Sequence, residues 1–171
     1  LVVVPAMLTH TRDMEHLLMD MEVRFLANRD ANLHFALLTD FGDARQEHMP
    51  QDAALLEAVR QSITALNHKY GGEDGSSFVW LHRPRRWNEQ ERIWMGHERK
   101  RGKLADLNAL LRGGAQDRFL CIAGKIKALS NIQYVITLDT DTQLARDTAR
   151  QFAGIMAHPL NRPLYDAQKQ R

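Results

Sequence analysis

Cysteine, long apolar runs and an excess of charge of one sign are all scarce in this sequence of 171 residues. The single cysteine, Cys121, excludes an internal disulfide framework and a zinc site built from cysteines, and it fits a reducing compartment. No apolar run approaches twenty residues, so no membrane-spanning helix is predicted. The formal net charge is +2, which gives no strong overall field to attract nucleic acid or an anionic membrane. The length fits one domain with a sizeable core.

Two common patterns of nucleotide and metal sites are also missing. The sequence contains neither a glycine-rich Walker loop nor a Gly-x-Gly-x-x-Gly motif. Its eight histidines include no pair at metal-binding spacing on a single helix face. Dinucleotide-binding and zinc-hydrolase functions are therefore weakly supported.

The most informative feature present is an apolar, partly β-branched run at residues 134–138 that stops at Asp139 and Asp141. Its composition and short length predict a buried strand. Ligands of open α/β sheets lie at the carboxyl ends of strands, and carboxylates suit Mg²⁺ or Mn²⁺ with phosphate oxygens as further ligands. The pair therefore predicts a divalent metal that holds a diphosphate. The same aspartates are also common as helix caps and turn formers.

A second predicted strand, residues 32–39, also leads into acidic residues, Asp40 and Asp43. If the two strands are neighbours, the carboxylates of Asp40 and Asp139 line one crevice. Asp40 would then hydrogen-bond a base or ribose, while Asp139 would hold the metal on the diphosphate. An Asx-turn that leaves the strand through Gly42 accounts for Asp40 and Asp43 equally well.

Strands and helices alternate along the chain, which predicts an α/β fold with a mostly parallel sheet flanked by helices. The expected strands cover residues 1–4, closed by Pro5, and residues 32–39, 78–82, 119–123 and 134–138. The expected helices cover the stretch that Thr11 or Asp13 caps, and residues 52–70, 103–111 and 147–156. A turn cluster at residues 71–77 precedes the third strand.

Basic residues gather between the third strand and the following helix. Four of them surround a glycine just before that helix: Arg99, Lys100, Arg101 and Lys103. Three more follow the third strand: Arg83, Arg85 and Arg86. Cations and backbone N–H groups at a helix start both favour phosphate, so these residues could clamp a leaving diphosphate.

Two other interpretations of the basic segment stay open. Charge runs commonly form a solvated face. The interleaved Trp87 and Trp94 also suit single-stranded nucleic acid stacked in a basic groove, although the near-neutral overall charge argues against that partner.

The run Val-Ile-Thr-Leu-Asp139-Thr-Asp141-Thr142 also matches the nucleophile strand of haloacid-dehalogenase-type phosphatases. In that chemistry the first aspartate attacks phosphorus and the second acts as acid and base. That family begins its fold with this strand and needs later Ser/Thr, Lys and acidic motifs. The residues after Thr142 show no further acidic strand end, so this alternative is less favoured.

An ordered set of motifs covering nearly the whole chain resembles the glycosyltransferase domain of cyclic β-1,2-glucan synthases. The motifs are Asn32-Leu-His-Phe-Ala-Leu-Leu-Thr-Asp-Phe, Arg83-Pro-Arg-Arg-Trp-Asn88, Trp94-Met-Gly-His-Glu-Arg-Lys-Arg-Gly-Lys-Leu104, Leu107-Asn-Ala-Leu-Leu-Arg-Gly113, residues 134–144 and Met156-Ala-His-Pro-Leu-Asn-Arg-Pro163.

This resemblance implies an incomplete GT-A-like, Rossmann-like fold in which residues 1–171 are the nucleotide-sugar-binding part of a glycosyltransferase domain. The parent would be a large multidomain protein at the cytoplasmic face of the bacterial inner membrane, with this segment itself soluble. The implied reaction is an inverting, metal-assisted transfer of glucose from UDP-glucose to a growing β-1,2-glucan, with Mg²⁺ or Mn²⁺ as cofactor. The implied partners are UDP-glucose, the glucan acceptor and the rest of the synthase, and no nucleic acid.

The resemblance also carries roles onto individual residues. Asp139 and Asp141 match the Asp-x-Asp metal motif, and Asp139 is also expected to contact the nucleotide sugar. Asp40 matches the acid that contacts uridine. Pro5 matches the end of the first strand beside the base. The segment with Lys100, Arg101 and Lys103 matches the one near the diphosphate, although it departs from the commoner Lys-Ala-Gly-Asn arrangement.

No catalytic base is identified in this chain. An inverting transfer needs a general base for the acceptor hydroxyl. In GT-A enzymes that carboxylate lies downstream of the point that Arg171 marks here, so we expect little or no turnover by this chain alone. A rival hypothesis is a non-catalytic fragment that serves as a folding or interaction unit.

Overall fold

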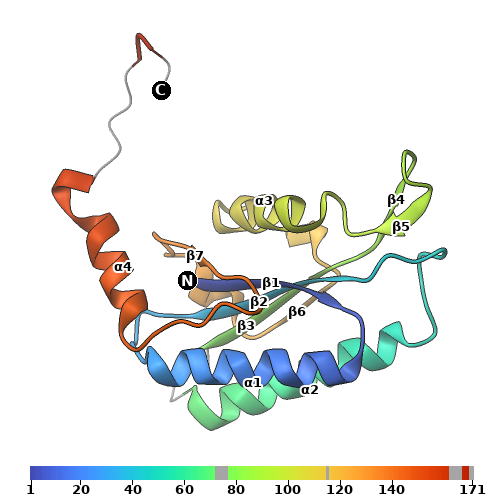
Figure 1. The fold of residues 1–171 in the computed structure, drawn as a ribbon, viewed down its shortest axis with the longest axis horizontal. Coiled ribbons are helices and arrows are strands. Elements are labelled where there is room, and N and C mark those ends of the chain that lie inside the picture. The colour runs from blue at the N-terminus through green and yellow to red at the C-terminus, as the bar shows by residue number, and fades with distance from the viewer. Residues whose placement is uncertain (72–76, 115, 162–166, 170–171) are drawn as a thin grey trace.

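A five-stranded, mostly parallel sheet flanked by helices forms the centre of the computed structural model, which describes residues 1–71, 77–114, 116–161 and 167–169 (Figure 1). The predicted α/β class is thereby confirmed. The strand order is β6-β3-β2-β1-β7, with only β6 antiparallel to its neighbour. The strands are β1 (Val2–Leu8), β2 (Phe35–Phe41), β3 (Phe78–Arg83), β6 (Cys121–Ala123) and β7 (Ile136–Thr137), and β4 (Arg86–Asn88) pairs with β5 (Ile93–Met95) in a separate hairpin.

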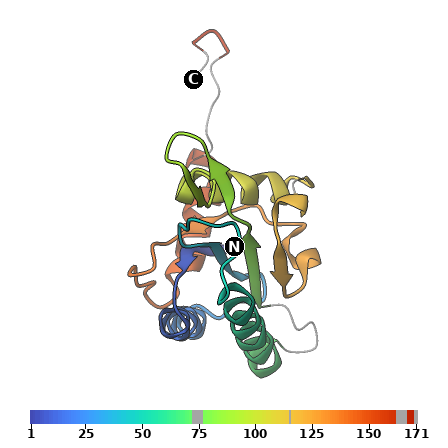
Figure 2. The same cartoon turned by 90° about the vertical axis from the view of Figure 1, so that its right-hand side faces the viewer.

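Helices cover both faces of the sheet. The α-helices are α1 (Thr11–Ala27), α2 (Asp52–Tyr70), α3 (Arg99–Leu111) and α4 (Thr148–Ala157), and short 3₁₀ turns lie at Gln116–Arg118, Ile126–Leu129 and Pro159–Asn161. Figures 1 and 2 show α1 and α2 side by side on one face and α3 on the other. Among the described residues, no helix combines the length and the apolar character that a membrane span needs.

The three central strands are apolar on both faces because each face is covered. Successive side chains of a strand point to opposite sides, so Val2, Val4 and Leu8 of β1 face α1 and α2, whereas Val3 lies in the core beneath α3. In β2, Asp40 continues the α3 side. Because of this alternation, each polar side chain at the ends of β2 and β3 points to one particular face of the sheet.

The prediction that Pro5 ends the first strand is wrong, because β1 continues to Leu8 and Pro5 pairs with Leu38 of β2. Residues two apart in a strand direct their backbone groups to the same side. The ladder to β7 has its last hydrogen bond from Leu138 N–H to the Val3 carbonyl, 2.9 Å. The backbone nitrogen of Pro5 therefore faces the β7 side of β1, where pairing has already ended, so its lack of an N–H costs no ladder hydrogen bond.

The strand expected at residues 134–138 is shorter and less buried than predicted. Only Ile136–Thr137 forms β7, at the edge of the sheet beside β1, with Thr137 exposed and Leu138 buried. β1 also separates β7 from β2, so the strands that lead to Asp139 and Asp40 are not neighbours. The short β7 results from pairing along one side to two residues of β1.

Helix ends differ from the expected positions more than helix centres do. Neither Thr11 nor Asp13 caps α1; the cap is His10, without a side-chain hydrogen bond, and Asp13 accepts a hydrogen bond from the Thr9 hydroxyl at 2.8 Å. Helix α3 starts at Arg99, four residues before the predicted start. The predicted turn at residues 71–77 falls largely on residues 72–76, outside the described part of the chain.

Candidate functional site

Asp40 lies in a buried cluster of charges on the α3 side of the sheet. Its side chain accepts two hydrogen bonds from its register partner Arg83, from Nε at 2.8 Å and from Nη2 at 2.9 Å. The Lys103 ammonium of α3 lies 3.1 Å from Oδ2 and donates to the Ala6 carbonyl at 2.6 Å. Only 2% of Asp40 is exposed, so contact with a nucleotide would require Arg83 or Lys103 to change partner.

Arg83 links this cluster to the start of α3. Its Nη1 donates to Asp106 at 2.7 Å, and its Nη2 donates to the carbonyls of His97 at 3.0 Å and Arg99 at 3.3 Å. Burial opposes the charge on Arg83, but hydrogen bonds to Asp40 and Asp106 outweigh it and raise the pKa of the guanidinium.

Burial dominates at the neighbouring ammonium. It lowers the pKa of Lys103, and the nearby Asp40 carboxylate only partly offsets this effect. Asp40 is therefore the partner that favours the charged form of this buried ammonium.

Two glycines allow α3 to start so close to the cluster. A Cβ atom on Gly96 would lie 2.3 Å from Oδ2 of Asp40, and one on Gly102 would lie 2.1 Å from the His97 carbonyl oxygen. Glu98 and Arg99 also adopt left-handed backbone angles, with φ of 53° and 48°. Strain of this kind persists only where surrounding contacts hold it, here the hydrogen bonds of Arg83.

A second buried ion pair, not expected from the sequence, joins Arg85 to Asp52 at the start of α2. The two groups form hydrogen bonds of 2.5 and 3.1 Å, and Arg85 also donates to the Gly42 carbonyl at 2.7 Å and lies 4.4 Å from the Phe41 ring centroid. Burial alone would raise the pKa of Asp52, but hydrogen bonds from Arg85 and the Met49 N–H lower it. The signal available in the sequence was the spacing of two residues between Arg83, the last residue of β3, and Arg85.

His82 occupies the opposite face of the sheet from Arg83. Trp80 Nε1 donates to the Thr39 hydroxyl at 2.9 Å, and that hydroxyl is hydrogen-bonded to His82 Nδ1 at 2.8 Å. His82 Nε2 is buried and has no hydrogen-bond partner among the described residues. Burial, followed by the nearby charges of Lys103 and Arg85, lowers the pKa of His82 to about 3, so the ring is neutral.

Asp139 and Asp141, in contrast, lie in an exposed loop at the carboxyl end of β7. The Asp139 side chain is 61% exposed and contacts the Lys100 ammonium, and Asp141 is also exposed. Within the described part of the chain, no group of three or more His, Cys, Asp or Glu residues is gathered for a metal. Two accessible carboxylates fit Mg²⁺ or Mn²⁺, which often takes its remaining ligands from water and phosphate.

Arg24 of α1 holds the Asp139–Asp141 loop from beneath, a role not expected from the sequence. This fully buried side chain donates from Nε to the Thr142 carbonyl at 3.0 Å and from Nη2 to the Thr140 carbonyl at 2.7 Å. The two carbonyls flank Asp141. Burial lowers the pKa of Arg24, while the charge of Asp141 is among those that oppose this. Its position in the apolar stripe of α1 was the signal available in the sequence.

The first turn of α3 connects the exposed and buried carboxylates. Lys100 contacts Asp139, and Lys103, three residues on and therefore on the same helix face, contacts Asp40. Arg101 points elsewhere, with an exposed side chain paired to Glu98. Among the other predicted site residues, Pro5 lies buried inside β1.

A hollow of about 620 Å³ opens at the carboxyl ends of β1 and β2. Its lining includes Thr9, His10, Gly42, Asp43, Met49 and Arg85. Of the two acids that follow the predicted second strand, Asp43 therefore lies at a cavity, whereas Asp40 is enclosed.

A comparison with known proteins finds a relative that aligns with nearly the whole chain. No protein-family model matches it. It is 41% identical over 170 residues, 99% of its length, to the cyclic beta-(1,2)-glucan synthase NdvB of Rhizobium meliloti (strain 1021). The chain is homologous to a short segment of a glucan synthase. It spans 6% of that protein's length, and the resemblance seen in its motifs is confirmed.

Proposed function

We propose that this chain is the nucleotide-sugar-binding part of a glycosyltransferase domain that transfers glucose from UDP-glucose to a growing β-1,2-glucan. The identity to NdvB over nearly the whole chain carries the proposal. The exposed carboxylates of Asp139 and Asp141 at the end of a sheet strand support its chemistry. The same proposal includes a large parent protein at the cytoplasmic face of the bacterial inner membrane and the glucan as the acceptor.

In this proposal, Asp139 and Asp141 would hold Mg²⁺ or Mn²⁺. The bound metal would supply electrostatic stabilisation of the charge on the leaving diphosphate. Lys100 is placed to exchange its contact with Asp139 for a phosphate oxygen, because its side chain is half exposed at the start of a thirteen-residue helix. Arg83 and Lys103 would act through the position of α3, since both are buried in the Asp40 cluster.

The nucleoside would occupy the hollow at the ends of β1 and β2. There, the exposed or half-buried side chains of Asp43, Arg45 and Gln46 offer hydrogen-bonding groups, and Met49 offers apolar surface. This placement would give Asp40 a supporting role beneath the nucleotide instead of direct contact with the base.

Calorimetry with UDP, with and without Mn²⁺, tests the proposal. We expect Mn²⁺ to tighten binding, and we expect the double variant Asp139→Asn/Asp141→Asn to lose only this Mn²⁺-dependent gain. Asp117→Asn, an exposed aspartate of the 3₁₀ turn Gln116–Arg118, is the matched control and should bind like the parent chain. Equal affinity with and without Mn²⁺ would contradict the metal assignment.

Two further measurements separate the alternatives. A melting temperature that does not respond to UDP-glucose plus Mn²⁺ would favour a folding or interaction unit. Hydrolysis of a generic phosphomonoester that disappears in Asp139→Asn would favour the phosphatase chemistry.

A further inference from the structure

The β4–β5 hairpin forms a second site beside α3, away from the main sheet. Trp87 and Trp94 face each other across the two strands with ring centroids 5.9 Å apart. Two backbone hydrogen bonds of 2.9 Å between Ala44 and Trp94 fix the hairpin to the loop after β2, and Arg99 of α3 bonds Asp43 of that loop at 2.9 Å. The hairpin is therefore held in place against α3.

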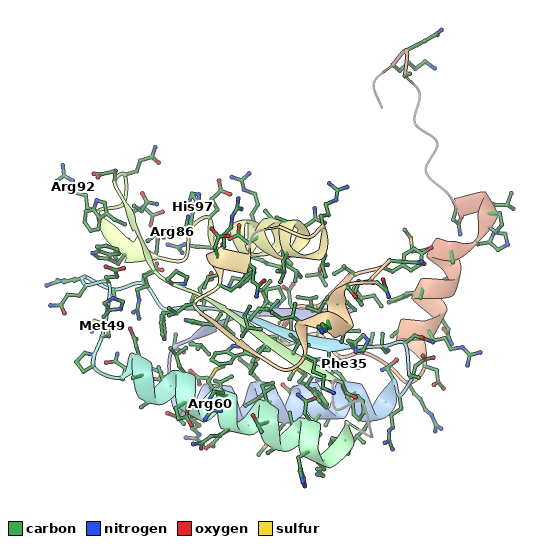
Figure 3. The ribbon with its side chains drawn as sticks, turned by 180° about the vertical axis from the view of Figure 1, so that it is seen from behind. Phe35, Met49, Arg60, Arg86, Arg92 and His97 are labelled. Carbon is green, nitrogen blue, oxygen red and sulfur yellow. The ribbon has the colours of Figure 1, made fainter. Side chains whose placement is uncertain are left out.

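A cavity of about 620 Å³ lies between this hairpin and the start of α3. Figure 3 shows Arg86 and His97 in this space and Arg92 at the tip of the hairpin. Trp87 lines the cavity with 43% of its surface exposed. An exposed indole held rigidly by its cross-strand partner offers a flat apolar surface at little further cost in side-chain entropy.

The charges that line the cavity cancel. Its ionised side chains are three arginines and three glutamates: Arg86, Arg99, Arg101, Glu89, Glu91 and Glu98. Arg99 bonds Glu91 at 3.2 Å, and Arg101 pairs with Glu98. An anionic ligand would meet as many carboxylates as cations, so the lining favours a neutral ligand that both donates and accepts hydrogen bonds.

Sugars match this lining. A pyranose ring has an apolar face of C–H groups, which can lie on an indole, and a rim of hydroxyls, which can bond to arginine, glutamate and amide side chains. The backbone also carries strain around the cavity, because Arg92, Glu98 and Arg99 all have positive φ. Residues held in this way are typical of functional sites.

The cavity and the Asp139 loop lie on two sides of the same helical turn. Arg99 and Arg101 line the cavity, and Lys100 between them contacts Asp139. A sugar chain in the cavity would therefore lie close to a donor held at Asp139.

We propose that the cavity between the β4–β5 hairpin and α3 binds a neutral oligosaccharide, with Trp87 as its stacking surface. Its assignment as the binding site for the growing glucan rests on the proposed function.

The test uses the full chain and a short linear β-1,2-linked gluco-oligosaccharide as the probe, with NMR of the three indole N–H groups as the readout. We expect the Trp87 signal to shift saturably while the signal of buried Trp80 stays in place. Trp87→Ala should weaken binding about tenfold, and Gln90→Ala, an exposed cavity residue, should weaken it less. Phe152→Ala, which removes an exposed aromatic ring from α4, should leave the affinity unchanged.

The absence of a saturable Trp87 shift in the parent chain would overturn the proposal. Equal affinity in the Trp87→Ala and Gln90→Ala variants would do the same, as would displacement of the probe by inorganic phosphate. UDP titrated with Mn²⁺ into the same samples reports the proposed transferase function separately. Oligosaccharide binding without UDP binding would support the cavity and contradict that function.

Discussion

Asp40 and Asp139 lie near the carboxyl ends of two parallel strands, yet their surroundings are opposite. Asp40 belongs to a central strand and is enclosed by Arg83 and Lys103. Asp139 follows an edge strand, its side chain is 61% exposed, and it contacts the half-exposed side chain of Lys100. Position in the sheet explains the difference. The α3 helix covers the end of β2, whereas the loop after β7 lies beyond the covered core.

This comparison separates two uses of a carboxylate at a strand end. A buried carboxylate with two cations is stabilising only while all partners are present, because each charge has lost its hydration. An exposed carboxylate keeps its hydration and can exchange a lysine for a metal ion at small cost. Asp40 therefore maintains the architecture, and Asp139 is available to a ligand.

Replacing the two aspartates one at a time should give the largest contrast. Asp40→Ala leaves Arg83 and Lys103 buried without their carboxylate, so we expect a loss of about 3–5 kcal/mol in unfolding free energy. Asp139→Ala should change it by about 1 kcal/mol or less, because its pair with Lys100 is exposed. Urea denaturation followed by circular dichroism measures both, and equal losses would contradict the division between the two sites.

Acid should lower the unfolding free energy of the chain through His82, which is buried like Asp40 but lies on the opposite face of the sheet. Its pKa in the folded chain is about 3, and an unfolded histidine titrates near 6.5. The unfolded chain therefore binds the proton first, and stability falls as the pH drops below 6.5 and levels off near pH 3. Between pH 6.5 and pH 4 this contributes a loss of about 3 kcal/mol.

A matched variant isolates the His82 contribution from that of the carboxylates. In His82→Asn the side-chain amide, which can donate and accept, can still form the hydrogen bond to Thr39 but does not titrate, so the variant should show a shallower decrease in stability over this pH range. Urea midpoints measured at several pH values provide the comparison. Parallel curves for the two proteins would show that His82 does not titrate as proposed.

Arg24 offers the finest test, because it acts on the exposed site from within the core. Arg24→Met removes both hydrogen bonds to the loop of Asp139 and Asp141 and should weaken the Mn²⁺-dependent part of UDP affinity about tenfold. UDP binding without Mn²⁺ should stay unchanged, which a general loss of structure would not allow. Arg12→Met, an exposed arginine of the same helix, is the control.

The layered α/β fold could be predicted from the sequence because apolar strands and amphipathic helices alternate with clear periodicity. Helix α2 shows this best, since its predicted and observed bounds agree. The order of the sheet could not be obtained in the same way. Placing β1 between β2 and β7 depends on crossovers that local patterns do not encode.

The candidate site was predictable in its residue types but not in its pairings. Charged residues near strand ends were visible in the sequence, and so was the basic segment before α3. Whether Lys100 or Lys103 would be buried depends on how α3 lies over β2, and Gly96 permits that close approach. The position of Arg24 in the apolar stripe of α1 indicates that it is buried, but it gives no indication of which backbone carbonyls the side chain will bond.

The alignment of β2 with β3 places Asp40 directly beside Arg83. The first four pairs of this ladder are apolar on both strands: Phe35–Phe78, Ala36–Val79, Leu37–Trp80 and Leu38–Leu81. The fifth pair, Thr39–His82, is joined by a side-chain hydrogen bond of 2.8 Å. A shift of the register by one residue would turn the Arg83 guanidinium to the opposite face and leave the Asp40 carboxylate without this partner. The ion pair, together with the Thr39–His82 hydrogen bond beside it, therefore selects one register for two strands that are otherwise apolar.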